Sequence, residues 1–201
     1  AYIVKARMQL MRDFGAFPAA HSAFLLNLGL ETLPVRIKQY CENAMIVAEF
    51  FANDAHFTDV RYPGLPGDRY YALAQKYLPH GSSGVISITM KGGREPAIRF
   101  MNGLKLASKE VHVADIRTCV LHPASATHRQ LTDEQLVAAG VNPGLIRFSV
   151  GLENIEDILD DIRQSLAALE QKGAGIACVQ TCRCLTQARL RHLRAGTHGR
   201  F

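Results

Sequence analysis

Residues 143–153, Pro-Gly-Leu-Ile-Arg-Phe-Ser-Val-Gly-Leu-Glu, give the strongest indication of the fold. The turn pair Pro143-Gly144 precedes a run of mostly apolar residues, which is typical of a strand that packs in a sheet. Asn154 follows and suits the N-cap of a helix, and the apolar positions from Ile155 to Leu169 keep helical spacing. A strand followed at once by an amphipathic helix predicts a sheet that is covered by helices.

The segments that precede this stretch alternate in the same way. Strands are expected at 57–62, 84–90 and 111–121, and with 145–152 they make four strands of one sheet. Helices are expected at 2–13, from 21 to 53, at 68–77, at 95–106 and from Thr132 onward, where the first turn is close to a capping box. Pro34 lies inside the long helix and should break or kink it near Leu30. The expected fold class is therefore α/β of the α+β type, with a small sheet and helices on one face.

The charge of the chain is distributed unevenly. Six basic and no acidic residues lie from Lys172 onward, so that residues 1–171 carry 17 basic and 18 acidic residues. A basic tail can contact nucleic acid, but no aromatic residue lies between these arginines to stack on bases, which favours a solvated end. No apolar run approaches the roughly 20 residues of a membrane span, and residues 1–7 contain no signal-peptide core. We therefore expect a cytoplasmic protein with no nucleic-acid or membrane partner.

The cysteines fall into two groups. Cys41 and Cys119 lie alone among apolar residues and are expected to be buried, reduced thiols. The tail contains Cys178, Cys182, Cys184, His192 and His198. These could ligate zinc, but the C-x3-C-x-C spacing is not one of the standard zinc patterns, so no metal site is predicted.

Arg147 is the residue with the clearest chemical potential. A guanidinium in an apolar strand is costly unless it is paired, and its planar fork matches a carboxylate. It could grip the carboxylate of a substrate, or it could form an internal salt bridge or point to solvent. The residues alone favour the structural alternatives.

Two further groups of polar residues lie near strand ends. Ser125 and Thr127 lie in the segment His122–His128, where they could contact a substrate or make local turn hydrogen bonds. His112 and Asp115 form a possible pair, although their spacing alone does not make them catalytic. Phosphate-binding, serine-nucleophile and zinc-protease motifs are absent from the sequence.

Several motifs, taken in order, resemble the Cys/Met-metabolism family of pyridoxal-phosphate (PLP) enzymes. They are Arg12–Ala16, Ala23–Leu26 with Gly29–Leu33, Tyr62–Leu65, Met90–Gly93, His122–Ser125 and Arg147–Glu153. The resemblance covers about residues 1–171. Within the family, Gly29–Leu33 and Thr127–Leu131 are most similar to O-acetylhomoserine sulfhydrylases, which replace the acetoxy group of O-acetylhomoserine with sulfide or a thiol in methionine and cysteine biosynthesis.

The resemblance implies an organisation and a set of substrate contacts. Residues 1–53 would link to a PLP-binding large domain, residues 54–171 would form the C-terminal substrate-binding domain of a fold-type I PLP enzyme with a mainly antiparallel sheet, and residues 172–201 would be a tail without a family counterpart. Arg147 would grip the α-carboxylate of the amino-acid substrate, and His112, Ser125 and Thr127 would lie near it. The intact enzyme would be a homotetramer.

The departures from the family concern catalysis. The family's Schiff-base lysine lies in an S-x-T-K-type motif, and no lysine of this chain follows such a motif. His112 occupies a position where relatives often carry Asn or Ser, and Ala126 replaces a common threonine. The expectation is a C-terminal part of a sulfhydrylase that contains no catalytic residue and is inactive alone. The alternatives are a methionine γ-lyase or cystathionine γ-synthase-like member, or a stand-alone, non-catalytic oligomerisation or binding fragment.

Overall fold

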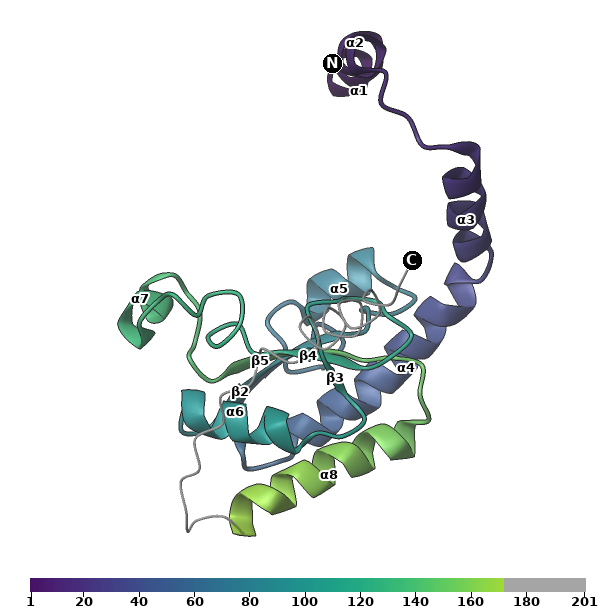
Figure 1. The fold of residues 1–201 in the computed structure, drawn as a ribbon. Helices are drawn as coiled ribbons and strands as arrows, with labels where there is room; N and C mark the ends of the chain where they lie inside the picture. Colours follow the sequence, from purple (N-terminus) through teal and green to yellow (C-terminus); the bar gives the residue numbers. More distant parts are fainter. Residues whose placement is uncertain (172–201) are drawn as a thin grey trace, which may run out of the picture. The chain divides into compact units, whose positions relative to one another are not determined.

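The computed structural model describes residues 1–171; the basic tail and its possible zinc ligands lie outside the described residues. Among residues 1–171, five strands form one sheet in the order β1 (Phe57–Arg61), β2 (Val85–Met90), β5 (Leu145–Ser149), β4 (Cys119–Leu121) and β3 (Ser108–Lys109). Neighbouring strands are antiparallel except β3 and β4, which are parallel. The expected mainly antiparallel sheet is confirmed, with β3 as an additional short strand (Figure 1).

Helices α4 (Leu33–Ala52), α6 (Arg94–Gly103) and α8 (Ile155–Gln171) cover one face of this sheet (Figure 1). Ile86 pairs with Phe148 across β2 and β5, and both side chains are fully buried beneath the helices. The Phe148 ring packs edge-on against Phe51 of α4, with the ring centroids 5.2 Å apart. Because side chains alternate along a strand, Arg147 lies on the opposite face of the sheet. The predicted placement of helices on one face is confirmed.

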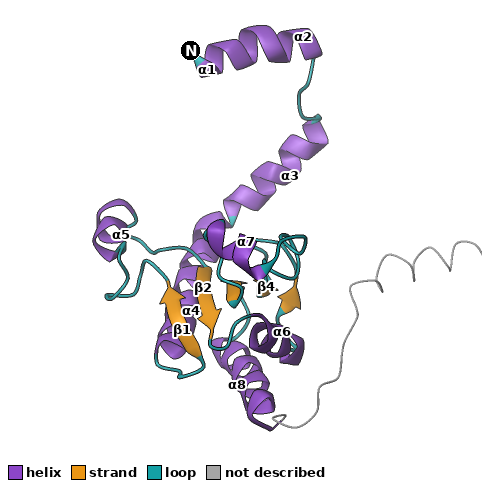
Figure 2. Cartoon of the chain, turned by 90° about the vertical axis from the view of Figure 1, so that its left-hand side faces the viewer, coloured by secondary structure: helices purple, strands orange, loops and turns teal. Residues whose placement is uncertain are grey.

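The first helices of the chain precede this core (Figure 2). The segments α1 (Tyr2–Lys5), the π-helical η1 (Ala6–Met11) and α2 (Arg12–Phe14) form one continuous helix that ends at Gly15, whose φ is 64°. Helix α3 (Ala20–Glu31) follows. None of the residues in these helices is buried.

Pro34 does interrupt the long helix, as predicted, but two residues later than Leu30. Helices α3 and α4 are separated at Thr32, and Pro34 lies in the first turn of α4. Proline is tolerated there because its nitrogen needs no hydrogen-bond partner in the first turn. The result is two helices in place of one kinked helix.

The strand predicted at 111–121 is wrong over most of its length. Only Cys119–Leu121 is a strand, and residues 110–118 form a loop between β3 and β4. Ala114 has a φ of 59°, which no strand residue adopts, and Val111 exposes 57% of its surface. The alternation of apolar and polar residues was misleading because the polar members pair with one another outside the sheet.

Two shorter helices complete the described part of the chain. Helix α5 (Tyr71–Tyr77) begins three residues later than expected. Helix α7 (Asp133–Ala138) has the predicted capping box: the Gln135 N–H donates to Thr132 Oγ1, and the Gln135 side chain accepts from the Thr132 N–H. No helix within residues 1–171 combines the length and apolar character needed to cross a bilayer.

Candidate functional site

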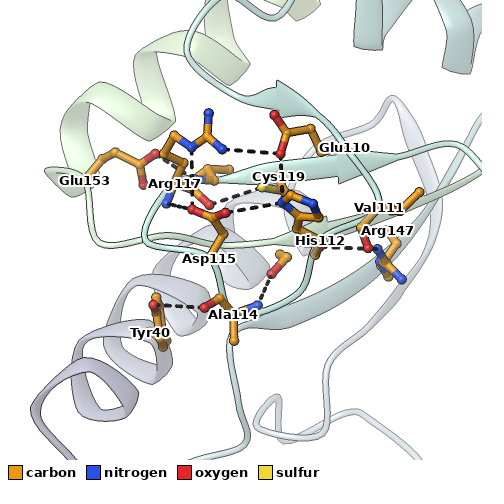
Figure 3. Close-up of polar contacts among 12 residues, drawn as sticks. Tyr40, Glu110, Val111, His112, Ala114, Asp115, Arg117, Cys119, Arg147 and Glu153 are labelled. Carbon is orange, nitrogen blue, oxygen red and sulfur yellow. Dashed lines mark hydrogen bonds and ion pairs between the residues drawn. The ribbon is translucent and has the colours of Figure 1, made fainter. Parts of the chain in front are cut away.

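Arg147 is held by backbone carbonyls. Its Nη2 donates to the carbonyl oxygens of Val111 at 2.7 Å and His112 at 3.4 Å (Figure 3). Its Nε is buried and has no hydrogen-bond partner among the described residues. No carboxylate in residues 1–170 lies within ion-pair distance of this guanidinium. An internal salt bridge, one of the two structural alternatives for Arg147, is therefore absent from the described part of the chain.

His112 lies next to Arg147 through its backbone, while its side chain belongs to an ion-pair cluster. The His112 Nδ1 is 2.9 Å from Glu110 Oε2 and 3.3 Å from Asp115 Oδ2. Arg117 pairs with the same two carboxylates (Figure 3). The backbone N–H of Arg117, followed by its side chain, holds the pKa of Asp115 below its usual value. The predicted pairing of His112 with Asp115 is thus present, and it stabilises the loop at 110–118.

The same cluster brings three possible metal ligands together. Donor atoms of Glu110, Asp115 and Cys119 lie within 4.8 Å of one another. Both carboxylates already pair with Arg117, and burial is the main reason why the pKa of the Cys119 thiol is raised. A protonated thiol is a poor metal ligand. The group therefore gives no support for a metal centre.

Ser125 and Thr127 make local hydrogen bonds. His122 is buried, and its Nε2 lies 2.7 Å from the Pro143 carbonyl, to which it must donate. Its Nδ1 therefore accepts from the Ser125 hydroxyl at 2.8 Å, which assigns the tautomer. Burial lowers the pKa of His122 and favours this neutral form. Thr127 Oγ1 is 2.9 Å from His128 Nδ1.

The structure therefore joins only part of the predicted site. Arg147 and His112 meet through a backbone carbonyl. No hydrogen bond within residues 1–170 connects Arg147 to Ser125 or Thr127, whose bonds are those expected of a turn.

Four residues connected to Arg147 or to its loop were given no site role from the sequence. Ser149 Oγ accepts from the Ala114 N–H at 3.1 Å. The two oxygens of Glu153 accept from the N–H and hydroxyl of Thr118 at 2.6 and 2.9 Å. A side chain at Gly151 would collide with the Glu153 carboxylate and with the backbone at Arg117–Thr118. For Ser149 the sequence did contain an indication. Ser149 lies two positions after Arg147, so both side chains belong to the same face of β5.

The atoms around Arg147 fit a carboxylate, and no lysine to which PLP could attach lies among them in the described residues. The group consists of a guanidinium and the two carbonyl oxygens that accept from it. None of the lysines in residues 1–170 forms a hydrogen bond within this group. A guanidinium that has a buried N–H without a hydrogen-bond partner can recognise a carboxylate.

A model of the Cys/Met metabolism PLP-dependent enzymes matches residues 2–167 of the chain. An O-acetyl-L-homoserine sulfhydrylase from Leptospira meyeri is 44% identical over 167 residues, which are 83% of this chain and 38% of that protein. An L-methionine gamma-lyase from Pseudomonas putida is 39% identical over 169 residues, which are 84% of this chain and 42% of the lyase.

A solved structure from Campylobacter jejuni is similar over the same part of the chain. That protein is assigned as an O-acetylhomoserine (thiol)-lyase and carries a pyridoxyl-lysine monophosphate. The TM-score is 0.74 at 36% identity, and the match covers 82% of this chain and 39% of the other. This chain thus spans about two fifths of the length of the proteins it matches.

Proposed function

The chain belongs to the Cys/Met metabolism PLP-dependent enzyme family, and we propose that it is the C-terminal, substrate-binding part of an O-acetylhomoserine sulfhydrylase. The intact enzyme would replace the acetoxy group of O-acetylhomoserine with sulfide or a thiol. The similarity to sulfhydrylases at up to 44% identity supports this choice of reaction. The chain's share of the reaction is to bind the amino-acid substrate and orient it.

The observation that carries the proposal is the environment of Arg147. A buried N–H without a partner costs free energy, and that cost is removed when a ligand oxygen accepts from it. A substrate α-carboxylate can accept from Nε and from a terminal nitrogen in the same plane, which makes a charge-assisted pair. The carbonyls of Val111 and His112 accept from Nη2, and Nε has no hydrogen-bond partner within the described residues.

The cofactor and its lysine belong, in this proposal, to a part of the enzyme outside this chain. PLP supplies the electron sink for the reaction. No lysine here follows an S-x-T-K-type motif, and the chain spans about two fifths of its relatives. Residues 1–53 would link to the PLP-binding large domain, and residues 54–171 would form the substrate-binding domain. The chain alone would be inactive.

Two features of the proposal concern assembly and location. The family resemblance leads us to propose a homotetramer, and the exposed apolar side chains of α1 to α3 support a further packing partner. A cytoplasmic location is supported by Cys41 and Cys119, which are free thiols.

A second candidate reaction is γ-elimination, because an L-methionine gamma-lyase is 39% identical over the same region. Both reactions begin with an α-amino acid, so the role proposed for Arg147 is the same in each. The two reactions can be distinguished by their products. The intact enzyme is incubated with methionine in one experiment and with O-acetylhomoserine plus sulfide in another, and the products of each are identified.

The test of the proposal is Arg147→Ala in the intact enzyme, defined here as this chain joined in frame to the lysine-bearing domain of a sulfhydrylase. Loss of a buried charge-assisted pair costs about 2–5 kcal/mol, so kcat/KM for O-acetylhomoserine should fall at least about 30-fold. Steady-state kinetics measure this change. The chain alone, incubated with PLP, should show no absorbance band of a lysine-bound cofactor.

Arg163→Ala is the matched control. Arg163 lies on α8, where within residues 1–170 it forms ion pairs only with Glu156 and Asp160 and lies over the Phe50 ring. None of these residues belongs to the proposed site, so kcat/KM should stay within about twofold of the parent. An unchanged kcat/KM in Arg147→Ala would remove Arg147 from the substrate site. A cofactor band in the chain alone would overturn the proposal that its lysines are not catalytic.

A further inference from the structure

Glu153 lies six residues after Arg147 and forms no hydrogen bond or ion pair with it within residues 1–170, but both are connected to the loop of residues 110–118. We propose that Glu153 is a positioning residue for carboxylate recognition. It holds Thr118, and thereby keeps the loop where the carbonyls of Val111 and His112 orient the Arg147 guanidinium. The inference rests on the proposed function, because it assumes that Arg147 binds the substrate.

The orientation of Arg147 depends on the loop. All of its side-chain hydrogen bonds within residues 1–170 go to the carbonyls of Val111 and His112, at 2.7 and 3.4 Å. An arginine side chain has several rotatable bonds, so its direction follows the acceptors that hold it. If these two carbonyls move, the guanidinium moves with them.

The loop does not hold its own shape through regular structure. It belongs to no strand or helix between Lys109 and Cys119, and Ala114 adopts a left-handed conformation with a φ of 59°. Val111, Val113 and Ile116 expose 57%, 52% and 61% of their surface, so they contribute little buried area. Apart from the ion pairs among its own charged residues, its position depends on hydrogen bonds to the surrounding elements.

Glu153 provides the strongest of these attachments. Both of its oxygens accept from Thr118, at 2.6 Å from the N–H and 2.9 Å from the hydroxyl, at the point where the loop enters β4. Thr118 Oγ1 in turn accepts from the Gly151 N–H at 3.0 Å. Hydrogen bonds to a carboxylate are about twice as strong as those between neutral groups.

The hydrogen-bonded pair of Glu153 and Thr118 is itself attached to the core. The Asn43 side chain, on α4, donates to the carbonyls of Gly151 and Glu153 at 3.0 and 3.1 Å. The loop is held at its middle as well, where the Ala114 N–H donates to Ser149 Oγ and the Tyr40 hydroxyl donates to the Ala114 carbonyl (Figure 3). Glu153 therefore connects a rigid helix to the residue that ends the loop.

The experiment is a double-mutant cycle in the intact enzyme. Glu153→Ala should raise KM for O-acetylhomoserine and lower kcat/KM at least about tenfold, since a displacement of about 1 Å can cost up to 100-fold. KM for sulfide should not change. In an Arg147→Ala background, Glu153→Ala should lower kcat/KM by less than about twofold, because the group through which it acts is gone.

The outcomes separate this inference from the proposed function. If Arg147→Ala leaves kcat/KM unchanged, the proposed function itself fails. If Arg147→Ala is impaired but Glu153→Ala has no effect, or has the same effect in both backgrounds, Glu153 is not a positioning residue. Glu156→Ala is the matched control, because Glu156 lies on α8 and pairs only with Arg163 in the described residues, and it should match the parent.

A general loss of folding is tested directly. The variants should keep the absorbance band of the lysine-bound cofactor and a cooperative thermal transition. If Glu153→Ala does not fold, Thr118→Val takes its place. It removes the hydroxyl that donates to Glu153 and accepts from the Gly151 N–H, and it leaves the bond from the Thr118 N–H to Glu153 intact. Thr118→Val should show the same dependence on Arg147, and an equal effect in both backgrounds would overturn the inference.

Discussion

Ala114 shows how one residue can carry strain in the loop that holds Arg147. Its φ of 59° is rare for a residue with a Cβ, because the Cβ approaches the following carbonyl oxygen. The residue persists there because its N–H donates to Ser149 and its carbonyl accepts from Tyr40. Strain held by surrounding hydrogen bonds is a common feature of functional sites.

We therefore expect Ala114→Gly to stabilise the protein. The left-handed conformation costs alanine about 1–2 kcal/mol, which glycine would not have to pay. The greater conformational freedom of glycine in the unfolded chain lowers the free energy of unfolding by about 0.5–1 kcal/mol, which offsets part of this stabilisation. A net gain of about 0.5–1 kcal/mol should raise the thermal midpoint by roughly 1–4 °C. Thermal unfolding followed by circular dichroism measures it.

Ala139→Gly is the control for this substitution. Ala139 is also exposed, but its φ is −81°, so glycine relieves no strain and the thermal midpoint should fall or stay the same. A lower midpoint for Ala114→Gly would mean that Ala114 does not adopt the left-handed conformation in solution.

At the scale of elements, the turn after β4 is built around a neutral histidine. His122 donates from Nε2 to Pro143 and accepts at Nδ1 from Ser125, so the turn connects β4 to the segment that leads into β5. Burial lowers the pKa of His122 from its ordinary value of 6.5. Protonation would place a charge in this buried position and would leave Nδ1 with a proton facing the Ser125 hydroxyl.

This pKa shift gives stability a defined pH dependence. Because the folded pKa lies below the unfolded value, the unfolded state binds more protons as the pH falls. The contribution of His122 is therefore fully present above about pH 6.5 and is lost as the pH falls toward the depressed value. We expect the urea midpoint of the parent to fall more between pH 7 and pH 5 than that of His122→Gln.

His128→Gln provides the comparison, since His128 lies on the same turn but is exposed. It should keep the pH dependence of the parent. If His122→Gln and the parent lose the same stability on acidification, His122 is not held in a neutral, buried form.

At the scale of the whole molecule, the first helices expose many apolar side chains. Phe24, Leu26 and Leu28 of α3 expose 60%, 65% and 50% of their surface, and none of the residues in α1, η1, α2 or α3 is buried. Apolar surface of this kind marks a region that packs against another chain or domain. Helix α4 changes along its length, since its second half contributes Ala44, Val47 and Phe51 to the core.

We expect the isolated chain to self-associate through this surface. Its sedimentation coefficient should rise with concentration, and the combined substitutions Phe24→Gln, Leu26→Gln and Leu28→Gln should reduce the association. Leu73→Gln with Val137→Gln is the control, because both residues are exposed outside these helices and should leave association unchanged. A chain that is monomeric at all concentrations would contradict this expectation.

The sequence by itself determined the features that depend on local pattern. It indicated β2 and β5, the capping box at Thr132, the cap at Asn154 and the interruption by Pro34, because each depends on neighbouring residues. It also indicated the family, through motifs that lie in order along the chain.

Only the tertiary structure decided how the site is built. The segment 111–121 alternates as a strand does, but pairs its charged residues with one another and becomes a loop. The surroundings of Arg147 and the connection of Glu153 to Thr118 join residues whose interaction depends on how the sheet is paired. Hydrogen bonds between distant residues leave no periodic signal, because neither partner's position along the chain fixes the other.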